Sequence, residues 1–161
     1  MTVVIVFGVI ALALFAGAYI SRRRFGLLGL ALTAGATLTG IWSYDAGLLV
    51  ASTGLIPDAA VANAVTLSLI VLTPPILLLF HGYSYKGGVG RLIGAFLFTA
   101  LALAFLVEPI GYALPLEGAG VDAYTALVEY KDVIISVGVI LAIVDLFLTK
   151  PAALTERKRK H

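Results

Sequence analysis

Thr2–Ile20 reads TVVIVFGVIALALFAGAYI and carries no charge, and Ser21-Arg22-Arg23-Arg24 follows it at once. A helix needs about 20 mostly apolar residues to cross the hydrocarbon core of a bilayer. This stretch therefore predicts a membrane span that the three arginines end. A cleaved signal peptide carries its positive charges before the apolar run rather than after it. We therefore expect a retained anchor whose N-terminus lies outside.

The composition of the whole chain agrees with a membrane protein. Of the 161 residues, 61% are hydrophobic and only 12% are charged. A chain of this size buries only about 60–70% of its unfolded surface, so in water it would expose far too much apolar area. Intrinsic disorder requires the opposite composition. The chain has no cysteine, which excludes disulfides and thiolate metal sites.

Four more apolar runs follow the first one. They cover residues 25–42, 61–80, 92–107 and 133–148. The sequence thus predicts an all-α integral membrane protein, a compact bundle of about five transmembrane helices. Residues 1–149 would form this single domain, and residues 150–161 a basic cytoplasmic tail.

The placement of charges predicts the orientation of these spans. With the N-terminus outside, 10 of the 11 basic residues fall on the inner side, and only Lys131 falls outside. Lysine and arginine accumulate on cytoplasmic connections of membrane proteins. We therefore expect an N-out, C-in membrane protein. The inner basic residues are Arg22, Arg23, Arg24, Lys86, Arg91, Lys150, Arg157, Lys158, Arg159 and Lys160.

The two outer connections are predicted to contain short interfacial helices. Ala46–Ile56 is almost wholly apolar but short, which is typical of an interfacial or re-entrant segment. Asp58 then stands where the N-cap of the third span belongs. Asp122 is placed to cap a second interfacial helix, Ala123–Tyr130, whose tyrosines suit the depth of the lipid headgroups.

Small residues recur at three- and four-residue spacing along the second span. They are Gly26, Gly29, Thr33, Ala36, Thr37 and Gly40. Small residues let helix backbones approach closely in lipid. Ala13-x-x-x-Gly17 and Gly90-x-x-x-Gly94 add similar surfaces. The stripe favours either packing within the bundle or a seam between copies of the chain.

Pro74-Pro75 interrupts the third span and removes two backbone donors. The carbonyls near Ile70 and Val71 lose their partners and need replacements, because lipid offers none. Such an interruption is typical of a broken helix beside a substrate or ion path. Because no second interrupted helix matches it, a fixed kink that shapes the bundle is the simpler interpretation.

Asp145 is the one acid that lies inside a predicted span. Carboxylates within a membrane are costly and are often functional, for example as proton or cation sites. Asp145 lies only five residues before Lys150, close to the cytoplasmic surface. A structural pair with Lys150, Arg91 or one of the three successive arginines is the simpler interpretation.

Residues with catalytic or ligand chemistry are scarce. His81 and His161 have no further histidine or acid at metal-ligand spacing, and no serine has a histidine partner. The turn Lys86–Arg91 is too short to cradle a nucleotide. We therefore expect neither an enzyme nor a bound metal or cofactor. The basic tail is expected to contact anionic lipid headgroups rather than nucleic acid.

Two motifs resemble those of the colicin V production (CvpA-type) membrane proteins. They are the arginine turn Ser21-Arg22-Arg23-Arg24-Phe25-Gly26-Leu27-Leu28 and the helix entry Gly90-Arg91-Leu92-Ile93-Gly94-Ala95. The likeness covers about residues 2–110. Family members carry a glycine before the arginine turn and an asparagine where Gly90 stands, and their core has four spans. The resemblance implies a small inner-membrane protein linked to toxin export and envelope upkeep.

Three functions remain open at this point. The resemblance implies an accessory protein that assists export or envelope maintenance, working through the small-residue stripe and the arginine turns. A second hypothesis is an oligomeric pore or carrier that uses Pro74-Pro75 and Asp145. A third is a non-catalytic subunit of a larger membrane complex.

Overall fold

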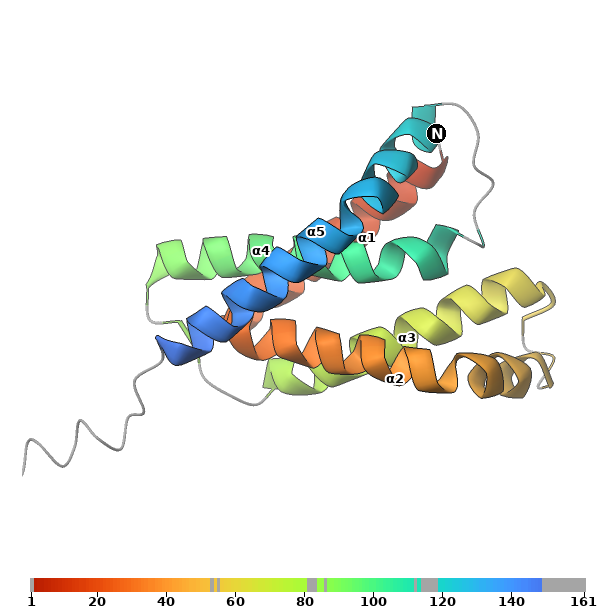
Figure 1. Cartoon of the computed structure of the whole chain (residues 1–161), viewed down its shortest axis with the longest axis horizontal. Coiled ribbons are helices and arrows are strands. Elements are labelled where there is room, and N and C mark those ends of the chain that lie inside the picture. Colours follow the sequence, from red (N-terminus) through yellow and green to blue (C-terminus); the bar gives the residue numbers. More distant parts are fainter. Residues whose placement is uncertain are drawn as a thin grey trace, which may run out of the picture.

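The computed structural model describes residues 2–52, 54, 56–80, 84–85, 87–111, 113 and 119–148. Five helices account for most of them: α1 (Thr2–Ser21), α2 (Phe25–Ser52), α3 (Ala59–Phe80), α4 (Gly88–Gly111) and α5 (Ala119–Phe147). Successive helices run in alternating directions (Figure 1). The last turns of α1, α3 and α5 therefore lie at the same end as the first turns of α2 and α4. We call this end, which carries Arg22, Arg23, Arg24 and Arg91, the arginine end.

Among these residues, four helical segments are long and apolar enough to cross a membrane. They are Val4–Ser21, Phe25–Tyr44, Ala59–Phe80 and Gly88–Gly111. This pattern suggests a membrane protein and confirms the predicted all-helical bundle. The fifth helix is longer, but its first half carries Asp122, Glu129, Lys131 and Asp132, so its apolar part is short. Length and composition thus support four of the five predicted spans.

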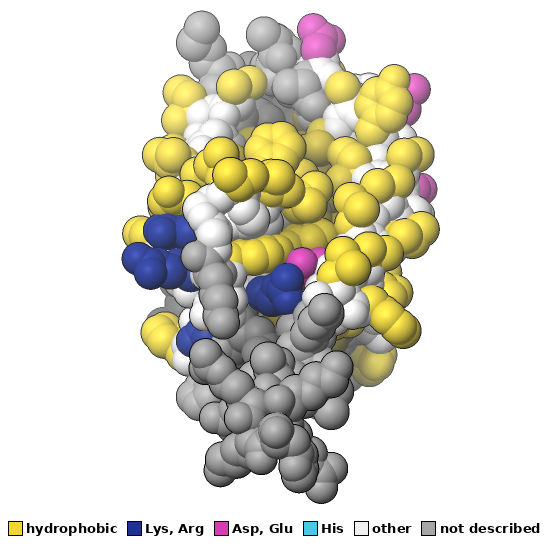
Figure 2. Space-filling view, turned by 90° about the vertical axis from the view of Figure 1, so that its left-hand side faces the viewer, with side chains coloured by type: hydrophobic (Ala, Val, Ile, Leu, Met, Phe, Trp, Pro, Cys, Tyr) yellow, Lys and Arg dark blue, Asp and Glu magenta, His cyan; other side chains and the backbone are white. Residues whose placement is uncertain are grey.

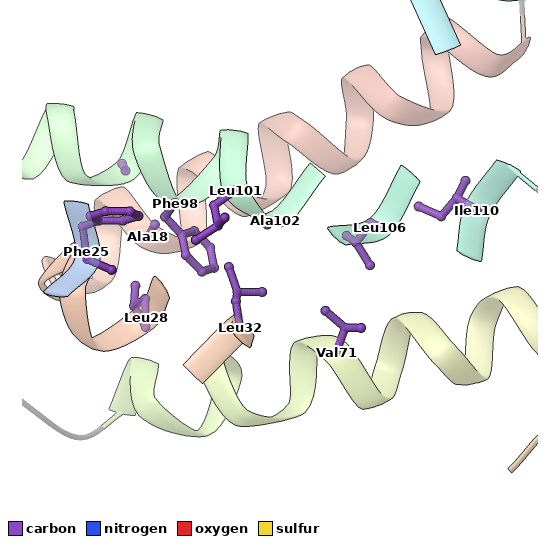
Figure 3. Close-up of a cluster of buried hydrophobic side chains, with 12 residues drawn as sticks. Ala18, Phe25, Leu28, Leu32, Val71, Phe98, Leu101, Ala102, Leu106 and Ile110 are labelled. Atoms are coloured by element: carbon purple, nitrogen blue, oxygen red, sulfur yellow. The ribbon is translucent and has the colours of Figure 1, made fainter. Parts of the chain in front are cut away.

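The central helix of the bundle is α4, which contacts each of the other four helices. Its buried side chains meet those of α2, with Phe98 and Leu101 of α4 beside Phe25, Leu28 and Leu32 of α2 (Figure 3). Along α2, these buried residues recur at three- and four-residue spacing and so share one face of the helix. The outward faces carry exposed large apolar side chains, as lipid contact requires.

The predicted break after residue 42 does not occur. Helix α2 continues to Ser52, so Ala46–Ile56 is no separate interfacial or re-entrant segment. No proline stands between Phe25 and Pro57, so no residue of this stretch removes a backbone donor from the extended helix. Asp58 caps α3 as predicted, because its Oδ1 accepts the Ala60 and Val61 N–H groups at 2.8 and 3.2 Å.

The predicted interfacial helix Ala123–Tyr130 is likewise the first part of a longer helix. Helix α5 runs without interruption from Ala119 to Phe147, so Asp122 lies in its first turn rather than at its N-cap. Gly138 faces Leu101, and a Cβ at this glycine would come within 2.9 Å of the leucine side chain. Close packing on α4 therefore anchors the apolar half of α5, and the polar half extends from it.

Helices α3 and α4 also exceed their predicted bounds. Helix α4 begins at Gly88, within the predicted turn, and continues past Glu108-Pro109 to Gly111. Helix α3 passes through Pro74-Pro75 without ending. The Thr73 hydroxyl donates to the Leu69 carbonyl at 2.6 Å, which adds a local bond beside the missing donors. The hypothesis of a broken third helix is therefore wrong.

Candidate functional site

The arginine turn between α1 and α2 is fastened to the segment that joins α3 to α4. Arg22 adopts a left-handed conformation with φ of 56°, a common way to end a helix. The Tyr85 N–H donates to the Arg22 carbonyl at 2.8 Å, and Arg23 and Ser84 form an isolated antiparallel bridge. Two connections far apart in sequence thus form one layer across this end.

Side chains from elsewhere in the chain cap the N-terminus of α2. The Phe25 N–H donates to the Tyr85 hydroxyl at 3.1 Å, and the Gly26 N–H donates to Asp145 Oδ2 at 2.9 Å. The first N–H groups of a helix have no partner within it. A carboxylate there also complements the positive end of the helix dipole. Asp145 of α5 therefore performs the role that an N-cap residue usually performs.

Asp145 also pairs with Arg24, one of the three successive arginines. Arg24 Nη2 lies 3.6 Å from Asp145 Oδ1, and the two side chains are only 20% and 18% exposed. The Arg24 guanidinium lies 5.3 Å from the centre of the Tyr85 ring. Of the pairings predicted for Asp145, the one with the arginine turn is confirmed, and the predicted partner Lys150 lies outside the described residues. We call Arg24, Tyr85, Asp145 and Gly26 the capping cluster.

Tyr85 is kept neutral by its surroundings. Burial raises the pKa of its phenol, and the nearby Asp145 charge and hydrogen bond raise this pKa further, against the lowering effects of the Phe25 N–H and Arg24. A neutral phenol can donate to the Asp145 carboxylate while accepting from Phe25. It therefore joins the first turn of α2 to the last turn of α5.

Two further arginines bind the free carbonyls at the C-termini of helices. Arg23 Nε and Nη2 donate to the Leu79 and Phe80 carbonyls of α3 at 2.9 and 2.8 Å. Arg91 Nε donates to the Tyr19 carbonyl of α1, with its guanidinium 3.7 Å from the Tyr19 ring centre. The last carbonyls of a helix lack partners within it. The alternating directions of the helices bring the C-terminal carbonyls of α1 and α3 to the arginine end. Arginine side chains there supply the hydrogen bonds that these carbonyls lack.

Figure 2 views this end directly. Lysine and arginine side chains gather over it, and an acidic side chain touches one of them at the centre. Apolar side chains surround these charges, as expected for a helix bundle whose sides face lipid. The predicted basic residue Lys86 and the tail Lys150–His161 lie outside the described residues.

The first two residues of the predicted small-residue stripe, Gly26 and Gly29, are buried inside the bundle, whereas Thr37 and Gly40 are exposed. At Gly26 an added Cβ would come within 2.5 Å of the Ala142 carbonyl oxygen, and at Gly29 within 2.9 Å of the Ala142 side chain. These glycines therefore let α5 approach α2. Gly40 and Gly17 have open space around them instead.

Gly90 and Gly94 serve a contact of a different kind. Both pack against the Tyr85 ring, which a Cβ at Gly94 would approach to 2.6 Å. The predicted Gly90-x-x-x-Gly94 surface thus packs against the Tyr85 ring of the preceding connection rather than against another helix.

No protein-family model matches the chain, and no curated protein or solved structure matches it either. The likeness to the colicin V production proteins therefore stays a prediction. Within the described residues, no three histidine, aspartate or glutamate side chains group as metal ligands would. Function has to be inferred from the contacts of the chain itself.

Tyr85 and Gly35 make close contacts between helices, although the sequence alone did not point to either residue. Tyr85 is central to the capping cluster. In the sequence, only its position as an aromatic residue beside a glycine-rich turn pointed to it. Gly35 meets Val71 of α3 so closely that any Cβ would overlap the Val71 carbonyl oxygen. Pro75 supplies no N–H to this carbonyl. Gly35 therefore allows α2 to pack closely against a carbonyl of α3 that lacks its usual helical donor.

Proposed function

We propose that this chain is a multi-pass inner-membrane protein, N-out and C-in, that acts as a non-catalytic accessory component beside another membrane protein. Export or envelope maintenance is the process that the resemblance to the colicin V production proteins implies. The supporting observation is how the chain uses its polar side chains. They form hydrogen bonds within single helices or between neighbouring helices of this chain rather than line a path.

Hydroxyl groups in the helices show this use clearly. Several threonines and one serine donate to the carbonyl four residues earlier: Thr33, Thr37, Thr39, Thr66, Thr73, Thr99 and Ser136. Three cavities along the described helices, of about 400, 250 and 380 Å³, are lined almost wholly by apolar side chains. A water-filled route requires polar groups along its walls.

The two residues proposed for a pore or carrier have structural partners. Asp145 binds Arg24 and the Gly26 N–H, and Pro75 lies buried in a continuous helix. The contacts therefore favour an accessory protein or complex subunit over a carrier.

Helix α1 offers the surface on which a membrane partner would pack. Only 6% of its apolar segment is buried within the bundle, against 56% for α4. Gly8 lies on this exposed face with open space around it, beside Ile5, Val9 and Leu12. A glycine on a lipid-facing surface allows the backbone of a second helix to approach closely.

Association is tested by extracting the tagged chain in a mild detergent and measuring the mass of the particle. We expect the protein mass, after the bound detergent is subtracted, to exceed the 16.8 kDa of one chain, and we expect Gly8→Leu to shift it towards the monomer. Gly40→Leu is the matched control, because Gly40 is also unobstructed but lies on α2. A monomer in the wild type, or equal loss in both variants, would contradict a partner on α1.

Orientation is tested by single-cysteine labelling. The chain has no cysteine of its own, so only the introduced cysteine reacts. We expect Pro57→Cys to react with a membrane-impermeant maleimide from outside intact cells. We expect Gly87→Cys to react only after the membrane is opened, since it lies at the arginine end. Both positions are exposed in the fold. Reversed labelling would overturn the N-out orientation.

A further inference from the structure

One of the apolar cavities is a groove on the outer surface between α1 and α4, close to the arginine end. Its volume is about 380 Å³. Its lining residues are Phe15 of α1 and Leu92, Ile93, Phe96 and Leu97 of α4. Since α1 ends at Ser21 and α4 begins at Gly88, the groove leads along the side of the bundle to the level of these helix ends.

Arg91 lies where the groove reaches the arginine end. It directly precedes Leu92 in the first turn of α4, and its guanidinium lies over the Tyr19 ring of α1. This ring is stacked in turn on the Phe15 ring of the groove wall, with the ring centres 5.9 Å apart and the planes within 8° of parallel. A continuous series of contacts thus joins a positive charge to an apolar wall.

The Arg91 guanidinium is held in place but keeps most of its hydrogen-bonding capacity. Its Nε donates to the Tyr19 carbonyl, and the Tyr19 ring supports its face. Its terminal nitrogens, Nη1 and Nη2, form no hydrogen bond with the described residues, and no described carboxylate forms an ion pair with it. A planar arginine fork fixed in this way matches the oxygens of a phosphate group.

The surroundings of Arg91 favour an anion that also carries apolar chains. Three further arginines lie at the same end, and Asp145, the one described acid there, is bound to Arg24. Figure 2 shows apolar side chains directly beside the basic ones at this end. A small soluble anion would contact only the charge, whereas a lipid with an anionic head would contact both the charge and the groove. Basic pockets between membrane helices bind such headgroups.

We propose that the groove between α1 and α4 binds an anionic phospholipid, whose phosphate oxygens accept hydrogen bonds from Arg91 and one of whose acyl chains lies along the groove. Arg91 and Tyr19 both lie in terminal turns, the depth of the headgroups, where tyrosine is common. Phe96 lies about 7.5 Å further along α4, at the depth of the acyl chains. This depth rests on the membrane location proposed above, which cysteine labelling tests separately.

Native mass spectrometry of the full chain in a mild detergent tests the site, because it resolves a single bound lipid by its mass. The probes are a phosphatidylglycerol and a phosphatidylcholine with the same acyl chains. We expect one tightly bound phosphatidylglycerol per chain. Phosphatidylcholine should bind about tenfold more weakly, since its choline brings a positive charge beside the arginines.

Arg91→Gln should weaken phosphatidylglycerol binding by about tenfold to a hundredfold, the usual effect of losing charge-assisted hydrogen bonds. Arg23→Gln is the matched control, because it makes the same charge change at the same end and also removes a cap of helix carbonyls, those of α3. It should weaken binding by less than about twofold. Equal losses in the two variants would indicate general attraction to positive charge and overturn the site.

Arg91→Lys keeps the positive charge and so tests the fork in a protein that retains its charge balance. We expect binding about threefold or more weaker than in the wild type, because an ammonium group is a point charge without the two parallel donors. Phosphatidylglycerol binding as tight as in the wild type would contradict recognition by the guanidinium.

Phe96→Ala tests the groove and should weaken phosphatidylglycerol binding by about threefold to tenfold, because apolar contact with the chain is lost. Phe147→Ala is its control, since Phe147 is 88% exposed at the same end but does not line the groove. Inorganic phosphate in large excess should not displace the lipid. Displacement would assign the site to a soluble anion, and equal affinity for the two lipids would also overturn the proposal.

Discussion

Gly35→Ala is expected to lower the free energy of unfolding by about 1–3 kcal/mol, the usual cost of forcing extra atoms into a packed interface. The added Cβ would overlap the Val71 carbonyl oxygen of α3. Backbone atoms cannot rotate away as a flexible side chain can. Helices α2 and α3 would have to separate along the most extensive contact between any two helices of the bundle. Alanine's better helix propensity, about 1 kcal/mol, offsets only part of this loss.

The measurement is thermal or denaturant unfolding of purified protein in one detergent. Gly40→Ala is the matched control, because it makes the same change on the same helix with open space around the new atom. We expect this control to equal or slightly exceed the wild type in stability. Gly35→Leu should yield little folded protein. If Gly35→Ala were as stable as Gly40→Ala, the close packing of α2 on Val71 would be wrong.

Asp145→Asn is expected to destabilise the protein by about 2–3 kcal/mol, less than the loss of a fully buried pair because both side chains keep some solvent contact. The amide retains one acceptor for the Gly26 N–H but removes the charge that pairs with Arg24. It also removes the carboxylate from the N-terminus of α2. The unfolding measurement described for Gly35 serves here as well.

Glu108→Gln is the natural comparison for this change. Glu108 pairs with Lys131 away from the arginine end, but its side chain is 54% exposed. Loss of such an exposed pair should cost less than about 1 kcal/mol. The double variant Arg24→Met, Asp145→Leu should lose less stability than the sum of its single changes, since it leaves no unpaired charge. If Asp145→Asn and Glu108→Gln lowered the free energy of unfolding by equally small amounts, the claim that the capping cluster stabilises the fold would be wrong.

The same Asp145→Asn variant distinguishes the accessory protein from a carrier. A proton or cation site would lose ion flux in liposomes when its carboxylate becomes an amide, whatever the change in stability. We expect no flux from the wild type beyond empty liposomes and no change in the variant. Flux that disappears in Asp145→Asn would replace the proposed function with transport.

Helix bounds were predictable where composition changes sharply and less so elsewhere. The uncharged run from Thr2 and the arginines after it locate α1 almost to the residue. The predicted second and fourth spans stop at Trp42 and before Glu108-Pro109, but α2 continues to Ser52 and α4 to Gly111. Proline within a helix proved a poor indicator of a break, since α3 continues through Pro74-Pro75.

The sequence by itself determined the apolar character, the all-helical class and the gathering of basic residues on one side. These follow from transfer free energies, which each residue carries whatever its neighbours. Only the tertiary structure decided which carbonyls Arg23 and Arg91 bind, that Asp145 caps α2, and that Gly35 meets Val71. Such contacts depend on the rotation and crossing of helices. Spacing along one helix defines a face, but it does not say which other helix packs against that face.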